Sequence, residues 1–115
     1  KRSSMHANAN TIKLGLEQYA MDHGGRYPRA HEVTQALESN NYLPGNHVTR
    51  NPYLEGTVAS RIVADHQAGT GFAGTPAYAP GTFLYRLDPK TKAYTLDYVY
   101  LTTQGPRLSS AREEP

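Results

Sequence analysis

Residues 4–23 constrain the fold more than any other stretch of this chain. They contain no proline, and their polar side chains gather on one side, at Asn8, Asn10, Lys13, Glu17 and Gln18. Apolar side chains recur at steps of four, three, four and three, at Met5, Ala9, Ile12, Leu16 and Tyr19. This spacing places the apolar side chains on one stripe of an α-helix. A helix of this length spans about 30 Å, the width of a small domain, so the rest of the chain is expected to pack along it.

A glycine pair after this helix predicts where it ends. Gly24 stands where a residue in the left-handed conformation would cap the helix. Residues 30–40 are then expected to form a short second helix, and turns are expected at residues 42–45 and 51–53. The narrow apolar stripe of the second helix consists of Val33, Ala36 and Leu37.

The clearest β pattern comes late in the chain. Residues 82–87 and 94–100 each alternate in polarity and flank a polar turn, so they predict an antiparallel hairpin. A hairpin alone is marginally stable, and the first helix is expected to cover it. Residues 57–64 are rich in β-branched side chains and predict a strand, with a helical turn as the alternative. The hairpin residues expected to pack under the helix are Leu84, Leu87, Leu96 and Tyr98. The alternative is that their neighbours on the other face of the hairpin pack there.

Length and composition narrow the class of protein. A chain of 115 residues predicts one domain. Its formal net charge of +2 is too balanced to indicate a nucleic-acid or membrane surface, although residues 1–29 carry five basic and two acidic side chains. The absence of cysteine excludes disulfides, iron–sulfur clusters and thiol catalysis. There is no signal peptide, no long apolar run and no initial Met, so a processed or truncated chain is expected.

The sequence contains no recognisable catalytic, cofactor-binding or metal-binding motif. Residues 69–74 match the dinucleotide-binding pattern G-x-G-x-x-G, but Pro76 and Pro80 follow, so no helix can begin there. Residues 67–81 are therefore interpreted as a flexible loop. The five histidines form no H-E-x-x-H motif, and no serine lies in G-x-S-x-G. We predict no catalytic, cofactor-binding or metal-ligating residue and no enzymatic activity; a metal site whose ligands converge from distant segments stays open.

Two weaker binding signals have ordinary structural explanations. The basic residues Lys1, Arg2 and Lys13 could contact phosphate, but a solvated helix end explains them as well. The hairpin tyrosines could stack on sugars or bases, but packing between strands is favoured. These tyrosines are Tyr94, Tyr98 and Tyr100.

Four segments follow one another in an order that resembles a known family. They are ANTIKLGLEQYAMDHGGRYP (residues 9–28), VTQALESNNYLPGN (33–46), NPY (51–53) and GTFLYRLDPKTKAYTLDYVY (81–100). In this order they resemble the soluble part of a type IV pilin or of a type II secretion pseudopilin. The likeness covers most of residues 5–101.

The resemblance implies an α+β, pilin-like fold. In it a long N-terminal helix packs on a small antiparallel sheet, with a short second helix and a long loop. Residues 1–115 would form a single domain, in which residues 1–23 are the C-terminal half of a spine helix and residues 82–101 are the hairpin. Residues 109–115 are expected to be a mobile tail.

The resemblance also implies a function. The chain would be a structural subunit that polymerises into an extracellular or periplasm-spanning filament for adhesion, motility or DNA uptake. The alternative is a pseudopilin of a type II secretion system, and a less favoured one is a secreted glycan- or nucleic-acid-binding module. Partners would be further copies of the chain, minor pilins or pseudopilins and, before assembly, the inner membrane through an apolar segment preceding Lys1. Weak contacts with surfaces, glycans or DNA are also expected. The chain would then reside in a surface filament or in the periplasm.

Two features of these families are absent from this sequence. Many pilins close a C-terminal loop with a disulfide, which a chain without cysteine cannot form. Major secretion pseudopilins carry a calcium-binding loop after the hairpin. Residues 102–115 contain no aspartate and a single glycine, Gly105, so no calcium site is predicted there.

Overall fold

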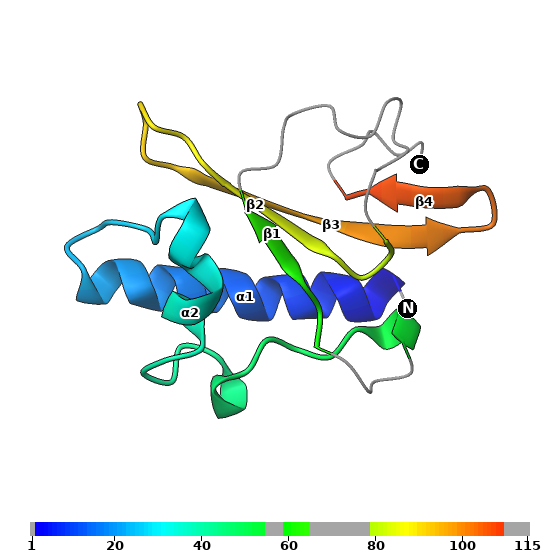
Figure 1. Cartoon of the computed structure of the whole chain (residues 1–115), viewed down its shortest axis with the longest axis horizontal. Coiled ribbons are helices and arrows are strands. Elements are labelled where there is room, and N and C mark those ends of the chain that lie inside the picture. Colours follow the sequence, from blue (N-terminus) through cyan, green and yellow to red (C-terminus); the bar gives the residue numbers. More distant parts are fainter. Residues whose placement is uncertain (1, 55–58, 65–78, 110–115) are drawn as a thin grey trace.

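The computed structural model describes residues 2–54, 59–64 and 79–109. The long helix α1 (Arg2–Asp22) lies along one face of a four-stranded sheet (Figure 1). The strand order is β1-β2-β3-β4. The fold class is therefore α+β, as predicted. The strands are β1 (Ile62–Ala64), β2 (Phe83–Leu87), β3 (Tyr94–Thr102) and β4 (Gly105–Leu108).

The sheet is mixed, so the prediction of a small antiparallel sheet was wrong at one edge. The hairpin of β2 and β3 is antiparallel, as predicted, and pairs Phe83 with Tyr98. β1, however, runs parallel to β2 and pairs Ile62 with Phe83. A parallel pair needs a long connection, and the pattern within a short strand carries no information on the direction of a distant partner. The predicted strand at residues 57–64 is also shorter, and residues 57 and 58 lie outside the described residues.

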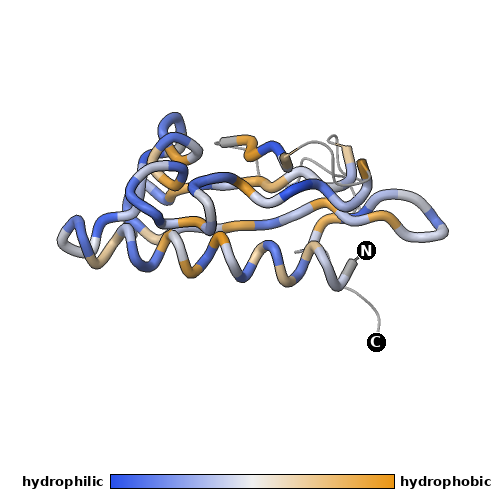
Figure 2. The backbone as a smooth tube through the Cα atoms, turned by 90° about the horizontal axis from the view of Figure 1, so that it is seen from below, coloured by the Kyte–Doolittle hydropathy of each residue, from blue (hydrophilic) through white to orange (hydrophobic). Residues whose placement is uncertain are grey.

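The apolar stripe predicted for α1 is buried in the core. Met5, Ile12 and Leu16 are fully buried and Ala9 is 2% exposed, whereas Tyr19 is only partly buried. Figure 2 shows the two layers edge-on, with α1 below the sheet. The side chains of the sheet in the same cluster include Phe83, Tyr85, Leu96, Tyr98 and Tyr100.

One residue that was expected under the helix lies on the other face. Leu84 is buried with Val99 and Leu108 in a second cluster, against which Val63 packs. Successive side chains of a strand point to opposite faces, so Leu84 cannot share a face with Phe83. At Leu84 the alternative therefore holds, because its neighbours Phe83 and Tyr85 lie in the α1 cluster. The three other hairpin residues belong to that cluster or pack against it, as predicted.

The end of α1 is capped as predicted. Gly24 and Gly25 have φ angles of 69° and 88°. The N–H of Gly25 donates to the carbonyl of Ala20 at 2.7 Å. A bond that spans five residues and closes over a left-handed residue is the signature of a Schellman motif. Glycine is favoured at both positions because this backbone conformation is costly for residues with a Cβ.

The second helix is shorter than predicted. A 3₁₀ turn (Ala30–Glu32) leads into α2 (Val33–Leu37), whose Val33 and Leu37 are buried. The helix does not reach residue 40, because Asn40 and Asn41 both have positive φ angles. Such angles lie outside the α-helical region and are found in turns.

The segment after α2 crosses α1 at a glycine. A Cβ built on Gly15 would lie 2.7 Å from the carbonyl oxygen of Tyr42 and 3.2 Å from the side chain of Leu43. Gly15 therefore lets the backbone at residues 42–43 approach the helix closely.

A buried asparagine joins the turn at residues 51–53 to the sheet. The Asn51 side chain accepts from the Tyr53 N–H at 2.8 Å and donates to the Pro80 carbonyl at 3.0 Å. Gly81 has a φ angle of 94°, and a Cβ there would collide with the Asn51 amide. Within the predicted loop at residues 67–81, only residues 79–81 are described.

The fourth strand was not predicted. β4 contains Pro106 and pairs antiparallel with β3 at the end of the strand order, a position at which proline is tolerated. Its short GPRL sequence shows no alternation. Ser109 was expected in a mobile tail, but it is bound to the sheet, because its N–H donates to the Tyr98 carbonyl at 2.8 Å. Residues 110–115 lie outside the described residues.

Candidate functional site

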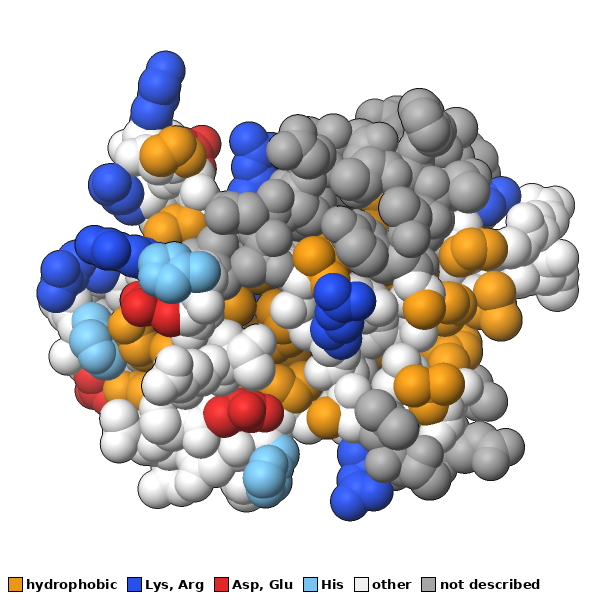
Figure 3. Space-filling model, viewed as in Figure 1, with side chains coloured by type: hydrophobic (Ala, Val, Ile, Leu, Met, Phe, Trp, Pro, Cys, Tyr) orange, Lys and Arg blue, Asp and Glu red, His pale blue; other side chains and the backbone are white. Residues whose placement is uncertain are grey.

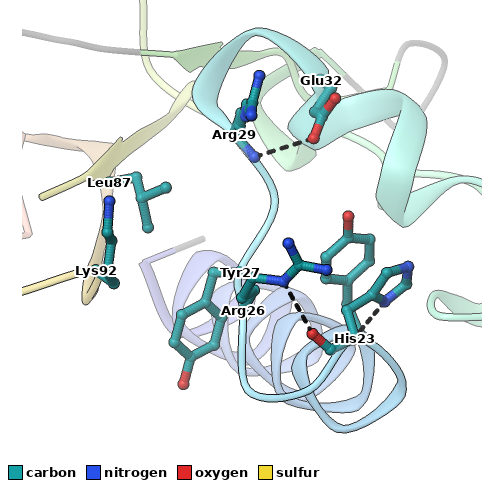
Figure 4. A pocket seen from close by; sticks show the side chains of 8 residues that line it. His23, Arg26, Tyr27, Arg29, Glu32, Leu87 and Lys92 are labelled. Atoms are coloured by element: carbon teal, nitrogen blue, oxygen red, sulfur yellow. Dashed lines mark hydrogen bonds between the residues drawn. The ribbon is translucent and has the colours of Figure 1, made fainter. Parts of the chain in front are cut away.

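Two surfaces of the described chain have the character of binding sites. The first is a cleft of about 480 Å³ at the C-terminal end of α1, which we call the α1-end cleft (Figure 4). It forms where the end of α1, the segment leading into α2, and the turn between β2 and β3 meet. Its lining residues are Tyr19, His23, Arg26, Tyr27, Arg29, Glu32, Leu87 and Lys92.

Hydrogen bonds at the end of α1 fix the His23 and Arg26 side chains that line this cleft. The His23 ring stacks on Tyr19, with the ring centroids 3.8 Å apart. Because a carbonyl only accepts, His23 Nδ1 carries the proton and donates to the Tyr19 carbonyl at 2.7 Å. Arg26 donates from Nε to the His23 carbonyl at 3.2 Å. The positive charge of Arg26 at a helix C-terminus is stabilising.

The opposite rim is also ordered by backbone contacts. Glu32 accepts from the Arg29 N–H at 3.3 Å. Asp88 accepts from the N–H groups of Lys90 and Thr91 at 2.8 and 3.2 Å, and these bonds lower the pKa of Asp88. They shape the turn that carries Lys92.

Tyrosine hydroxyls tie the surroundings of the cleft together. Tyr85 donates to the Pro28 carbonyl at 2.7 Å, and burial raises its pKa. Tyr42 donates to Asp22 at 2.7 Å, and this bond raises the pKa of Tyr42 to about 12. Tyr27 donates to the Glu17 carboxylate at 3.1 Å. These hydroxyls are structural contacts of the protein itself.

The hairpin tyrosines have the role that was favoured for them. Tyr98 and Tyr100 are 7% and 0% exposed and lie in the main cluster. Tyr94 packs against that cluster, with its ring edge-on to Tyr27 at 4.8 Å. Packing of these tyrosines inside the fold is confirmed.

The second surface is the face of α1 directed away from the sheet, which we call the open face of α1. Figure 2 shows this side of the helix without a covering described element. Leu14 and Met21 are 68% and 81% exposed. A stripe of uncharged, exposed residues runs along this face at steps of three, four, four and three: Ala7, Asn10, Leu14, Gln18 and Met21.

A shallow groove borders the open face. It has a volume of about 460 Å³ and lies between α1 and the segment at residues 41–45. The helix contributes Thr11, Leu14 and Gln18 to it. The sequence interpretation missed this face, although a second stripe with helical spacing was a usable signal.

The other sequence candidates do not converge. Within residues 2–54, 59–64 and 79–109, no three His, Cys, Asp or Glu side chains form a possible metal site. The G-x-G-x-x-G match at residues 69–74 lies outside the described residues, as do His66 and Lys1. Lys13 is exposed on α1. In the same described segments, no helix is long and apolar enough to cross a membrane.

Comparison with known proteins adds no assignment. No protein-family model, no curated protein and no solved structure matches this chain. Function must therefore be argued from the two surfaces and from the order of the elements.

Proposed function

We propose that this chain is a non-catalytic structural subunit of a filament of the type IV pilin kind, in which α1 is part of a helical spine. The observation that carries the proposal is the open face of α1. A helix that buries one stripe in its own fold and exposes a second, uncharged one has a surface for another molecule.

Physical chemistry favours a copy of the same chain as the occupant. Exposed apolar side chains such as Leu14 and Met21 lose water-contacting area when they pack against another helix. A face that contacts a different surface of the next copy, without closing a ring, generates a filament. The order of helix, short second helix and hairpin supports the pilin-like form of this proposal.

The proposal includes its cellular setting. The chain would be the extracytoplasmic part of a precursor held in the inner membrane by a preceding apolar segment. It would assemble with further copies and with minor subunits into a surface pilus. A pseudopilin in a type II secretion system is the alternative, and it would use the same face.

The first test is to read the coding sequence upstream of Lys1. About 20 consecutive apolar residues, the length that spans a bilayer, would support the proposal. A polar segment there would overturn the membrane-anchored form.

The second test changes the open face in the full-length protein. Leu14→Gln combined with Met21→Gln should abolish filaments that can be sheared from cells while leaving the domain folded. Leu101 is a matched control, because it is 50% exposed but lies on β3. Leu101→Gln should leave filaments intact. Normal filaments from the double variant would refute the role of this face.

A further inference from the structure

We propose that the α1-end cleft binds a small organic anion, whose carboxylate or phosphate group is held by Arg26 with help from Arg29 and Lys92. This site lies apart from the open face of α1, so it is independent of the filament proposal. It adds a ligand-binding function to a subunit otherwise argued to be structural.

The distribution of charge supports an anionic ligand. The cleft is lined by three cations, Arg26, Arg29 and Lys92, and by one carboxylate, Glu32. With His23 neutral, the lining carries +2, which equals the formal net charge of the whole chain. Figure 3 shows basic and histidine side chains at the end of the molecule that carries the cleft (left), with acidic side chains among them. A concave site with an excess of one sign of charge concentrates ligands of the opposite sign.

The carboxylates near the cleft are already engaged by neutral donors. Glu17 accepts from the Tyr27 hydroxyl, and Asp22 accepts from the Tyr42 hydroxyl. Glu32 accepts from a backbone N–H. In the part of the chain that the structure describes, the three cations of the cleft form no ion pair. Their charges are therefore available to an anion from outside the protein.

Arg26 has the best geometry for the central contact. Its Nε is used by the His23 carbonyl, which anchors the guanidinium and leaves the two terminal NH₂ groups to donate. Figure 4 shows Arg26 between Lys92 on one side and His23 on the other, with Arg29 on the far rim. Paired N–H donors in one plane match the two oxygens of a carboxylate or phosphate.

The remaining lining limits the size and shape of the ligand. Tyr19 and His23 form a stacked pair, and Tyr27 and Leu87 add apolar surface. A volume of about 480 Å³ lies in the range of small-molecule sites. These walls suit a ligand with one ring attached to the anionic group.

The test is an NMR titration of the folded 115-residue chain with three probes. Inorganic phosphate and D-glucuronate carry the two candidate anionic groups, and D-glucose is the uncharged counterpart of glucuronate. We expect saturable shifts of the His23, Arg26 and Arg29 amides at about 10 mM probe or below, with no such shifts from glucose. Binding by only one of the anions supports the site and identifies the group that it takes.

Matched variants separate a site from general attraction to positive charge. Arg26→Gln should weaken binding about tenfold, as expected for loss of a charge-assisted hydrogen bond. Lys13→Gln removes the same charge from the exposed surface of α1 and should change affinity by less than about twofold. If Arg26→Gln perturbs the fold, Lys92→Gln replaces it, with an expected loss of several-fold. Equal weakening by the cleft and control variants, equal shifts from glucose, or no saturable shift with either anion would overturn the proposal.

Discussion

The two faces of α1 have similar spacing and opposite environments. Leu16 is fully buried, whereas Leu14, two positions earlier, is 68% exposed. The buried stripe packs on the aromatic face of β2 and β3, while the open face carries its uncharged side chains in solvent. Spacing along a helix thus shows which residues share a face. It does not show whether the protein itself covers that face.

The largest expected difference is between these two leucines. Leu16→Ala should lower the free energy of unfolding by about 2–5 kcal/mol, because it leaves a cavity in the core. Leu14→Ala should change it by less than about 0.5 kcal/mol, as is usual for exposed positions. Urea unfolding of both variants checks this contrast. Similar losses for the two would show that the open face is also covered.

A second contrast uses small residues on the two faces. Helix propensity alone favours Gly15→Ala by about 1 kcal/mol, but the added Cβ would lie 2.7 Å from the Tyr42 carbonyl oxygen. We expect a net destabilisation of about 1–3 kcal/mol from this overpacking. Asn10→Ala on the open face should instead stabilise by a few tenths of a kcal/mol. A gain in stability from Gly15→Ala would contradict the close crossing at residues 42–43.

A buried tyrosine hydroxyl can be compared with an exposed one. Tyr85→Phe leaves the Pro28 carbonyl without its donor in a buried place, which should cost about 1–3 kcal/mol. Tyr27→Phe removes an exposed hydrogen bond to Glu17 and should cost less than about 1 kcal/mol. Thermal or urea unfolding of the pair measures the difference, and an equal cost would place the Tyr85 hydroxyl in contact with water.

Alkaline pH should lower the free energy of unfolding. The pKa of Tyr94 is raised to about 12, chiefly by burial, and that of Tyr42 to about 12, chiefly by the bond to Asp22. In the unfolded state the pKa of tyrosine is about 10. The folded state therefore binds more protons than the unfolded state between about pH 10 and about pH 12. Stability is therefore full below about pH 10 and falls as the pH rises toward about 12. Melting temperatures across this window, with tyrosinate absorbance, test the prediction; a flat profile would refute it.

A similarly small effect on stability is expected from the open-face double variant. Leu14→Gln with Met21→Gln should alter the free energy of unfolding by less than about 0.5 kcal/mol, although the same changes should abolish filaments. Urea unfolding of the isolated chain provides the measurement. A large loss of stability would mean that any loss of filaments reflects unfolding.

Local patterns predicted a substantial part of the fold. The stripe of α1, the cap at Gly24 and the hairpin of β2 and β3 all follow from interactions between residues near in sequence. The excess of basic residues in residues 1–29 includes Arg26 and Arg29. The positive charge on one side of the α1-end cleft was therefore visible in the sequence. Lys92, on the other side, gave no such signal.

By itself, the sequence determined the helix, its buried stripe and its end, and the pairing of β2 with β3, because spacing and backbone preferences act within a few residues. The tertiary structure alone decided the parallel direction of β1, the addition of β4 and the early end of α2. It also decided that one face of α1 is open and that Lys92 lines the same cleft as Arg26. Each of these depends on packing between segments far apart in the chain, where no local preference selects the partner.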